Sequence, residues 1–447
     1  MGLRIQDERF ERATRDYITA YQLERLQKLL NATAAKNDFY REHWRTVGAT
    51  SDILSIEEFT ARIPVVRKAD FMADQQRKPP FGLRVDQALE SRAPLMVCTT
   101  SGTSGQGVEV HTQTRAEADV AREVYAYLFR WAGLERGDSI FLNYPITMLG
   151  GGRIEMNGLE GYGLSVYPVG NYDVGRKLEL MERFQPKAIM ATTSYLGHLA
   201  AASTTSPPCK SVTALLGGGE GGGFSWFERL ENDWQASVFN HYGATQTRVD
   251  NMFPCENGLG TRDHPGMLHN IDPYFLLEVI DAETGRQVAD GEAGEIVLTS
   301  LFHDEVPMIR CAMGDRAVYR EPGYCNCGRP FCGIEIGTIS RIDDRQKVKG
   351  INIWPQAVDD VLFDTPQVDE YQIVLTSSAS EADVATLRVM PLPNVPAALL
   401  ESCMRDLTQR LRERIGISFK VELLEAGTLA RSEYKARRWI DERVHTQ

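Results

Sequence analysis

Apolar residues recur at two different spacings in the first part of this chain, and each spacing predicts a different element. Between residues 17 and 35 they recur every three to four positions, as on one face of an amphipathic helix. Short apolar runs, with helical stretches between several of them, predict strands at 139–145, 187–194, 212–219 and 236–243. This alternation predicts an α/β domain with a largely parallel sheet, in which ligands bind at the carboxyl ends of the strands.

The pattern changes near residue 275, where apolar and polar positions begin to alternate. Three such runs, separated by turn residues, predict a small antiparallel region at 274–281, 294–301 and 315–321. Further on, strand-like runs surround an amphipathic helix over 396–416, which predicts a small α+β domain. We place the boundary at Asp343–Asp344, which gives domains 1–342 and 343–447.

Length and charge narrow the functional classes. A chain of 447 residues exceeds one compact core, and a net charge of −12 argues against a nucleic-acid partner. No run of about 18 apolar residues could span a membrane, and the charged N-terminal sequence lacks the apolar core of a signal peptide. We therefore expect a cytoplasmic protein that binds neither nucleic acid nor membrane.

The stretch VCTTSGTSGQGVEVHT, residues 97–112, combines three glycines with five hydroxyl side chains between two strand-like ends. Glycines allow a turn that directs several backbone N–H groups inward, which makes an anion-binding nest. An ordinary Gly/Ser turn in a hairpin fits the same residues. Taken alone, the stretch leaves both interpretations open.

Five motifs follow one another along the chain: TTSGTSGQG (99–107), HYGATQT (241–247), PMIRCAMGD (307–315), SRIDDRQKVKGINIWP (340–355) and LARSEYKARRWIDER (429–443). In order and spacing they resemble the adenylate-forming superfamily, and most closely its phenylacetate–CoA ligase and coenzyme F390 synthetase branch. The resemblance covers nearly the whole chain. It implies an acyl-CoA synthetase-like fold, with a large N-terminal α/β domain and a small mobile C-terminal lid.

The resemblance also implies a reaction in two halves. A carboxylic acid attacks the α-phosphate of ATP, with Mg²⁺ bound, to give acyl-AMP and pyrophosphate. A thiol, CoA or the phosphopantetheine of a carrier protein, then displaces AMP. Transfer to an amine is an alternative acceptor reaction, and a regulator that binds nucleotide without catalysis is an alternative function. A homodimer is possible.

Roles for single residues come from the motif match, although most of these residues alone are also typical of turns or exposed surfaces. Lys435 is expected to bridge the reacting carboxylate and the α-phosphate, with Thr245 as a second catalytic group. Asp315 and Arg341 are expected at the ribose, and Asp343 at the hinge. The phosphate loop is Thr100, Ser101, Gly102, Thr103, Ser104 and Gly105. Further nucleotide contacts are expected from Gly218, Gly219, Glu220, His241, Tyr242, Gly243, Ala244 and Gln246.

Two positions depart from the family pattern. Gln246 stands where the family has a glutamate that helps to bind Mg²⁺, and an amide oxygen is a weaker ligand than a carboxylate. Gln106-Gly107 replaces the usual Lys-Pro and removes a cation near the pyrophosphate. We expect weaker or water-mediated magnesium binding in an enzyme that is still active.

Cysteine spacing suggests a metal site. Four of the eight cysteines lie within residues 311–332, and the pair in YCNCG can share one tetrahedral ion. The resemblance supplies the other two ligands and selects His269 over His264. The predicted structural zinc site, in the region 255–332, is Cys255, His269, Cys325 and Cys327, with Cys311 and Cys332 as competing ligands. Free buried thiols beside a surface histidine are the alternative.

The acid pocket is expected between residues 143–151, residues 193–198 and the loop at Tyr242. Its candidate walls are Tyr144, Met148, Tyr195 and His241. Aromatic and apolar walls suit an aryl or arylacetic acid, although each of these side chains is also compatible with ordinary core packing.

Overall fold

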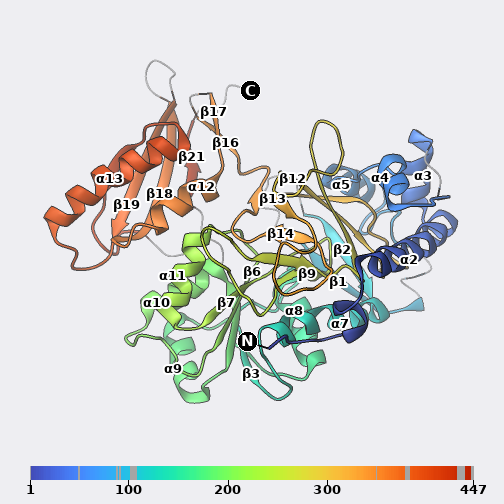
Figure 1. Cartoon of the computed structure of the whole chain (residues 1–447), viewed down its shortest axis with the longest axis horizontal. Helices are drawn as coiled ribbons and strands as arrows, with labels where there is room; N and C mark the ends of the chain where they lie inside the picture. The colour runs from blue at the N-terminus through green and yellow to red at the C-terminus, as the bar shows by residue number, and fades with distance from the viewer. Residues whose placement is uncertain are drawn as a thin grey trace.

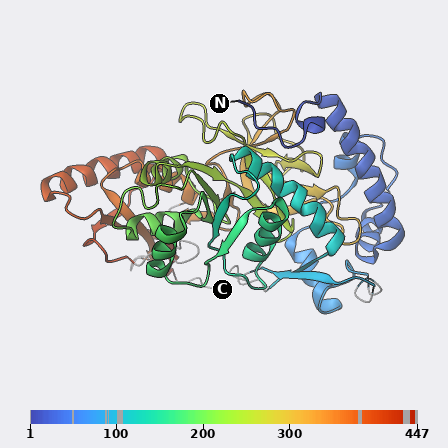
Figure 2. The ribbon, with the colours of Figure 1, turned by 90° about the horizontal axis from the view of Figure 1, so that it is seen from below.

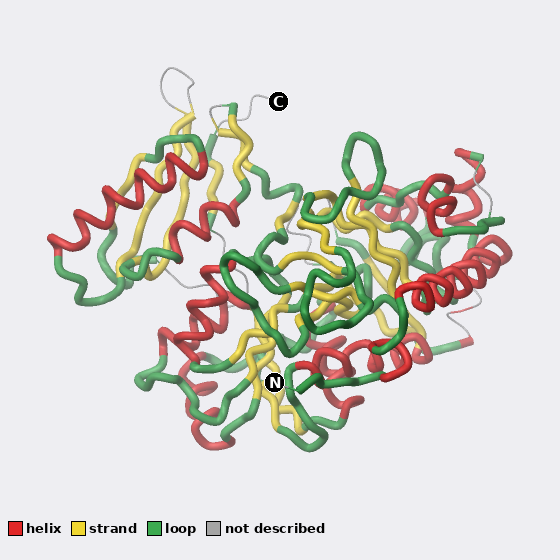
Figure 3. The backbone as a smooth tube through the Cα atoms, in the orientation of Figure 1, coloured by secondary structure: helices red, strands yellow, loops and turns green. Residues whose placement is uncertain are grey.

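The computed structural model describes residues 2–48, 51–86, 89, 92–100, 108–348, 350–377, 383–429 and 438–443. A large mixed α/β unit occupies most of the molecule, and a smaller α+β unit, orange to red in Figure 1, lies at one end. Strands form the interior and helices flank them (Figure 3). The predicted fold class is therefore confirmed. The predicted site residues Ser101, Gly102, Thr103, Ser104, Gly105 and Lys435 lie outside the described residues.

Helices make up the first part of the chain, and their ends follow from capping side chains. The long helix α2 (Arg15–Lys36) begins after Thr14, whose side chain accepts a hydrogen bond from the Tyr17 N–H, and it buries the predicted apolar face. It runs along the side of the molecule far from the C-terminal unit (Figure 2). The other helices here are α1 (Glu8–Glu11), α3 (Asp38–Val47), α4 (Ile56–Arg62) and α5 (Lys68–Arg77).

A hairpin and a parallel sheet carry the first predicted motifs. Strands β1 (Leu95–Thr99) and β2 (Val110–Thr114) pair antiparallel on either side of the glycine-rich stretch. The five-stranded sheet has the order β4-β3-β5-β6-β7, and its neighbouring strands pair parallel, as predicted. Its strands are β3 (Ser139–Leu142), β4 (Ser165–Pro168), β5 (Ala188–Thr192), β6 (Ala214–Gly218) and β7 (Ser237–Asn240). The helices of this region are α7 (Arg115–Trp131), α8 (Gly150–Tyr162), α9 (Val174–Phe184), α10 (Thr193–Ala202) and α11 (Phe224–Trp234).

An antiparallel sheet follows in the order β11-β12-β13-β14-β10-β9-β8, with β15 paired to β13. The runs predicted near 275, 295 and 315 become β11, β12 and β13, which pair in sequence. The strands are β8 (Tyr242–Ala244), β9 (Val249–Pro254), β10 (Met267–Asn270), β11 (Phe275–Ile280), β12 (Ala293–Ser300), β13 (Cys311–Arg320), β14 (Gly333–Glu335) and β15 (Ser340–Arg341).

The C-terminal unit has a four-stranded sheet in the order β20-β19-β18-β21 and a separate ribbon β16-β17. Sequence patterning did not predict β21 (Trp439–Asp441), which pairs parallel with β18. The unit packs on the large one where Trp226 of α11 meets Phe363 of α12, with ring centroids 4.5 Å apart. Its remaining elements are β16 (Gln346–Val348), β17 (Ile351–Ile353), α12 (Pro355–Phe363), β18 (Val368–Ser377), β19 (Asp383–Pro391), α13 (Ala397–Ile415) and β20 (Lys420–Leu423). Within the described residues, no helix combines the length and apolarity that crossing a membrane requires.

Candidate functional site

Three residues predicted at the nucleotide come together from distant parts of the chain. The Tyr242 hydroxyl donates to Asp315 Oδ2 at 2.8 Å, and Arg341 Nη1 donates to Asp315 Oδ1 at 3.2 Å. Sheet register explains this contact, because Asp315 of β13 pairs directly with Arg341 of β15. Burial raises the pKa of Tyr242 well above its ordinary value, so the phenol stays protonated as a donor. The Asp315 carboxylate is buried and held in place by both neighbours.

The loop after β6 lies against the motif at 241–247. A Cβ atom on Gly218 would lie 2.2 Å from His241 Cε1, so the imidazole needs a glycine at this position. His241 Nδ1 is 2.7 Å from Asp250 Oδ2. Gly219 follows with a φ of 78°, which suits glycine. Glu220 accepts hydrogen bonds from the Ser194 N–H at 2.5 Å and the Thr193 hydroxyl at 3.1 Å, which ties this loop to the start of α10.

The second half of the motif contacts both neighbouring loops. A Cβ atom on Gly150 would lie 3.0 Å from Thr245 Oγ1, so the predicted catalytic threonine borders the start of α8. Gly243 lies against the Asp250 carboxylate, and the Ala244 N–H donates to the Thr247 hydroxyl at 3.1 Å. These contacts fix the turn between β8 and β9.

Gln246, the departure from the family pattern, binds a carboxylate that the sequence analysis did not single out. Its Nε2 donates to Glu109 Oε2 at 3.1 Å. Glu109 is fully buried, and its N–H donates to the Thr100 hydroxyl at 3.0 Å, at the edge of the glycine-rich stretch. Because a carboxylate accepts but does not donate, this bond orients the amide and turns its oxygen away from Glu109.

Charges around Glu109 keep that carboxylate ionised. Burial raises the pKa of Glu109, but a hydrogen bond with His111 and the positive charges of Lys68 and Arg84 outweigh burial and leave the pKa below its ordinary value. Lys68 Nζ lies 3.7 Å from Glu109 Oε2. Burial, reinforced by the charge of Arg84, lowers the pKa of His111 to about 4, so the imidazole is neutral at pH 7.

The predicted walls of the acid pocket differ in exposure. Tyr144 and Tyr195 are buried, whereas Met148 is 55% exposed. The Tyr195 hydroxyl accepts a hydrogen bond from Lys177 Nζ at 2.7 Å, and Lys177 also donates to the Gly170 carbonyl at 3.3 Å. Tyr195, a predicted wall of the acid pocket, therefore contacts a buried lysine that the sequence did not reveal.

Asp343 lies at the junction of the two units. The Ile342 N–H donates to the Gly314 carbonyl at 2.9 Å, which continues the pairing of β15 with β13. Asp343 follows this contact, is exposed, and precedes β16. The predicted hinge thus comes directly after a backbone tie to the large unit.

The four predicted metal ligands converge on one point. One ligand atom from each of Cys255, His269, Cys325 and Cys327 lies within 4.8 Å of the others. Cys255 Sγ is 3.6 Å from Cys325 Sγ, and Cys327 Sγ is 3.5 Å from His269 Nε2. Hydrogen bonds with Cys255 lower the pKa values of Cys325 and Cys327 and raise the pKa of Cys255 well above its ordinary value, so two of the three thiols favour the thiolate form. Zinc prefers thiolates and imidazole in a tetrahedron, and this donor set suits it.

The competing ligands lie in other surroundings. Cys332 Sγ contacts Asp272 Oδ1 at 3.3 Å, and Cys311 Sγ contacts the Ala312 carbonyl at 3.8 Å. The ring of His264 lies against Tyr324, with centroids 4.6 Å apart. All eight cysteines, each within the described ranges, are free of disulfides.

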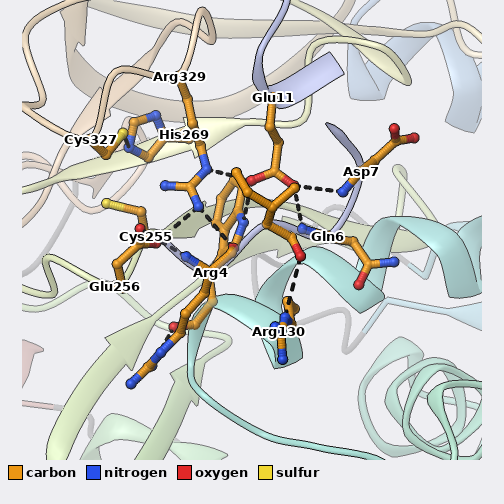
Figure 4. Close-up of polar contacts among 12 residues, drawn as sticks. Arg4, Gln6, Asp7, Glu11, Arg130, Cys255, Glu256, His269, Cys327 and Arg329 are labelled. Carbon is orange, nitrogen blue, oxygen red and sulfur yellow. Dashed lines mark hydrogen bonds and ion pairs between the residues drawn. The ribbon is translucent and has the colours of Figure 1, made fainter. Parts of the chain in front are cut away.

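The N-terminal segment is fastened beside the metal ligands through a buried arginine (Figure 4). Arg329 Nε donates to Glu11 Oε2 at 2.6 Å, and its Nη2 lies 3.0 Å from Glu256 Oε2. The guanidinium lies 4.5 Å from the ring centroid of Trp131, and Trp131 in turn meets His269 edge to face. Glu256 follows one ligand and Arg329 lies two residues after another, so the metal loops and the N-terminal segment form one buried network.

Residues missed from the sequence share one property: their roles depend on a partner that lies outside their own helix or strand. Glu109 meets Gln246 across 137 positions of sequence, and Asp250 meets His241 across a turn. Glu155 on α8 is buried near Asp250. A charged residue inside the otherwise apolar strand pattern VEV at 108–110 is the one local signal that could have identified Glu109.

Comparison with known proteins adds family information to this geometry. The family model described as AMP-binding enzyme matches residues 18–301, and the one described as AMP-binding enzyme C-terminal domain matches residues 350–443. A phenylacetate-coenzyme A ligase of Pseudomonas putida is 27% identical over 446 residues, covering 97% of this chain and 96% of the relative. Its counterpart in Thermus thermophilus is also 27% identical and covers 96% and 98%.

Solved structures add information on the arrangement of the two units. A 2-hydroxyisobutyryl-CoA ligase in the postadenylation state, with 2-HIB-AMP, has a TM-score of 0.88 at 27% identity, covering 97% of this chain and 91% of that one. The same ligase in the thioesterification state, with 2-HIB-AMP and CoA, has a TM-score of 0.69 at 98% and 92% coverage. Because the coverage is nearly the same in both comparisons, the lower TM-score indicates that parts of the two structures are placed differently. The two units of this chain are placed more nearly as in the postadenylation structure of that ligase than as in its thioesterification structure.

Proposed function

The chain belongs to the AMP-binding enzyme family, and we propose that it activates a carboxylic acid with ATP and transfers the acyl group to CoA. Relatives over nearly the full length are phenylacetate-coenzyme A ligases, and a similar structure is a 2-hydroxyisobutyryl-CoA ligase. The names of these relatives and the motifs of this chain support the same activity, the AMP-forming ligation of an acid to a thiol.

The observation that carries the proposal is the arrangement of Tyr242, Asp315 and Arg341. A carboxylate that already accepts bonds from a tyrosine and an arginine is held rigidly enough to receive two ribose hydroxyls. We assign the ribose to Asp315 and Arg341, and the adenine and α-phosphate to the loops at 218–220 and 241–246. We assign the β- and γ-phosphates to Thr100 and residues 101–105, and the meeting of carboxylate and α-phosphate to Thr245 and Lys435.

Magnesium would be held at Gln246 in this proposal. The amide oxygen is free to face a cation because the amide nitrogen is committed to Glu109. The ion supplies charge neutralisation at the phosphates when it is bound. The ionised Glu109 carboxylate, which is hydrogen-bonded to the Gln246 amide, adds negative charge that Gln246 itself lacks. The proposed magnesium site would therefore have a carboxylate next to its ligand and not as its ligand.

Movement about Asp343 would separate the two half-reactions. The similarity to a postadenylation state, and the lower similarity to a thioesterification state, support a C-terminal unit that takes more than one position. Such closure also protects a labile acyl-AMP from water. We place the boundary between the domains 1–342 and 343–447 at this residue.

Zinc at Cys255, His269, Cys325 and Cys327 would have a structural role. Four protein ligands leave no open position for a substrate, so the ion would fasten loops of the region 255–332 together. Metal analysis of the purified protein tests this proposal, with about one zinc ion per chain expected for a closed tetrahedral site. A Cys325→Ser variant should lose the ion, whereas Cys403→Ser in the C-terminal unit should retain it.

Acid-dependent exchange of labelled pyrophosphate into ATP tests the first half-reaction. We expect exchange with at least one member of a panel of aryl, arylacetic and hydroxy acids, in Mg²⁺ or Mn²⁺. Asp315→Asn should weaken it, whereas Asp119→Asn on the exposed face of α7 should not. No exchange across the panel would favour a nucleotide-binding regulator. Supplying preformed acyl-AMP with CoA, a carrier protein or an amine then identifies the acceptor.

A further inference from the structure

Beside the predicted acid pocket lies a buried cluster of three titratable side chains. It consists of His241 after β7, Asp250 of β9 and Glu155 of α8. His241 Nδ1 lies 2.7 Å from Asp250 Oδ2, while Gly218 and Gly243 leave room for these two side chains. The cluster therefore lies directly behind the loops assigned to the nucleotide.

Glu155 reaches this cluster because α8 is broken near its start. Gly151 and Gly152 have non-helical backbone angles, and a Cβ atom on Gly152 would lie 2.4 Å from the Pro145 carbonyl. The break packs the start of α8 against residues 144–145, which belong to the predicted pocket. Glu155 comes in the next turn and is 7% exposed.

The cluster is incomplete within the part of the chain that the structure describes. Glu155 Oε2 and His241 Nε2 are buried without a hydrogen-bond partner, and Asp250 Oδ2 meets only the His241 ring. Burial, and then the charge of Asp250, raise the pKa of Glu155 well above its ordinary value. Asp250 is therefore near, but no hydrogen bond joins the two carboxyl groups. Buried polar atoms rarely stay unpaired, so a donor between them would stabilise the site.

The other side chains that face the cluster leave Glu155 Oε2 without a donor. Tyr125 of α7 accepts from the Asp250 N–H at 3.4 Å, and its hydroxyl also forms a hydrogen bond with the Asp250 carboxylate. Lys177 of α9 donates to Tyr195 and to the Gly170 carbonyl. Thr245 borders Gly150 at the opposite end of the α8 break.

We infer that the acyl chain of the substrate carries a hydrogen-bond donor, a hydroxyl or an amine, which Glu155 and Asp250 recognise. The inference rests on the proposed function, because it requires the acid to bind beside Thr245 and His241. It replaces the expectation of purely apolar and aromatic walls with a pocket for polar carboxylic acids. A site built to bind a donor discriminates strongly against the analogue that lacks it, since its buried acceptors then stay unpaired.

Stable analogues of the acyl-adenylate test the inference without turnover. The probes are phenylacetyl-sulfamoyladenosine and a series in which one hydrogen of the acyl part is replaced by a hydroxyl or an amine. Isothermal titration calorimetry gives each dissociation constant. We expect at least one donor-bearing member to bind about tenfold to a hundredfold more tightly than the parent, because its donor satisfies buried acceptors that the parent leaves unpaired. The hydroxyl and amine arms show which donor is preferred.

Variants assign the preference to Glu155. Glu155→Met should abolish it, Glu155→Gln should retain part of it, and Glu160→Met at an exposed position of α8 should leave it unchanged. If every donor-bearing probe binds the wild-type protein as tightly as the parent or more weakly, the inference is wrong, but the proposed function is not affected. The same conclusion follows if Glu155→Met keeps the preference. If no member of the series binds, the proposed function itself fails and the inference fails with it.

Discussion

The proposed nucleotide site and the proposed metal site of this molecule both contain an arginine paired with a carboxylate, but they differ in exposure. At the nucleotide site, sheet pairing brings Asp315 beside Arg341, and the guanidinium of Arg341 stays partly exposed, with 45% of its side chain accessible. Beside the proposed metal site, Arg329 and Glu11 are both fully excluded from solvent. A partly exposed ion pair such as Asp315–Arg341 can bind a ligand from solvent. A fully buried pair such as Glu11–Arg329 can only stabilise the fold. Variants should therefore affect activity at the first site and stability at the second.

The largest effect on activity is expected for Lys435→Ala. Removing the ammonium group leaves two anions to react without neutralisation, so formation of acyl-AMP should fall about a hundredfold or more. Thiolation of supplied acyl-AMP should remain nearly unchanged, and so should the thermal midpoint. Single-turnover assays of each half-reaction measure the two effects. An equal loss in both would contradict the assigned role.

The largest effect on stability is expected for Arg329→Met. The substitution leaves Glu11 and Glu256 buried without their partner, and breaking a buried ion pair in this way costs about 3 kcal/mol. Chemical denaturation measures the loss. The rate of pyrophosphate exchange per folded molecule should not change.

The exposed pair of Arg12 and Glu8 provides a matched control. Arg12→Met should shift stability by less than about 1 kcal/mol, since exposed pairs contribute little. Because Arg329 bridges the N-terminal segment to the metal loops, zinc removal should also speed proteolysis of the first residues in the wild-type protein. If chelation leaves the rate of proteolysis unchanged, the order of the N-terminal segment does not depend on zinc, and the proposed coupling is wrong.

Asp315→Asn should have a smaller effect, and on the nucleotide rather than the fold. The amide keeps the shape of the side chain but loses one acceptor and the charge, so the KM for ATP should rise about tenfold. Initial-rate kinetics measure this change. A fall in kcat without a change in KM would place Asp315 in the chemistry instead of in ribose binding.

Glu109→Gln should have the smallest effect of the four. Without a carboxylate to orient it, the Gln246 amide can turn its nitrogen to the cation, so Mn²⁺ should bind about threefold more weakly in the presence of ATP. Electron paramagnetic resonance of Mn²⁺ measures the affinity. Glu117→Gln is unsuitable as a control because it is itself buried, whereas Glu123→Gln on the exposed side of α7 should change nothing. Tighter Mn²⁺ binding in Glu109→Gln would contradict the role assigned to Glu109.

Patterns confined to a few neighbouring residues were readable from sequence, and contacts across the chain were not. Alternation of strands and helices predicted the parallel sheet, and YCNCG with the motif match predicted the four residues that converge near Cys255. Nothing local marks Arg329 as the partner of Glu11, because 318 positions separate them. Glu155 resembles any polar residue of an amphipathic helix until the break at Gly151–Gly152 turns it inward.

The fate of the carboxylate oxygen tests the central claim most directly. Turnover of an ¹⁸O-labelled acid with ATP and CoA should give AMP that carries one ¹⁸O atom per molecule, because the oxygen that attacks the α-phosphate stays there when the thiol displaces AMP. Mass spectrometry of the nucleotide reads this out. Unlabelled AMP, or label that appears in orthophosphate beside ADP, would contradict acid activation through an acyl-adenylate.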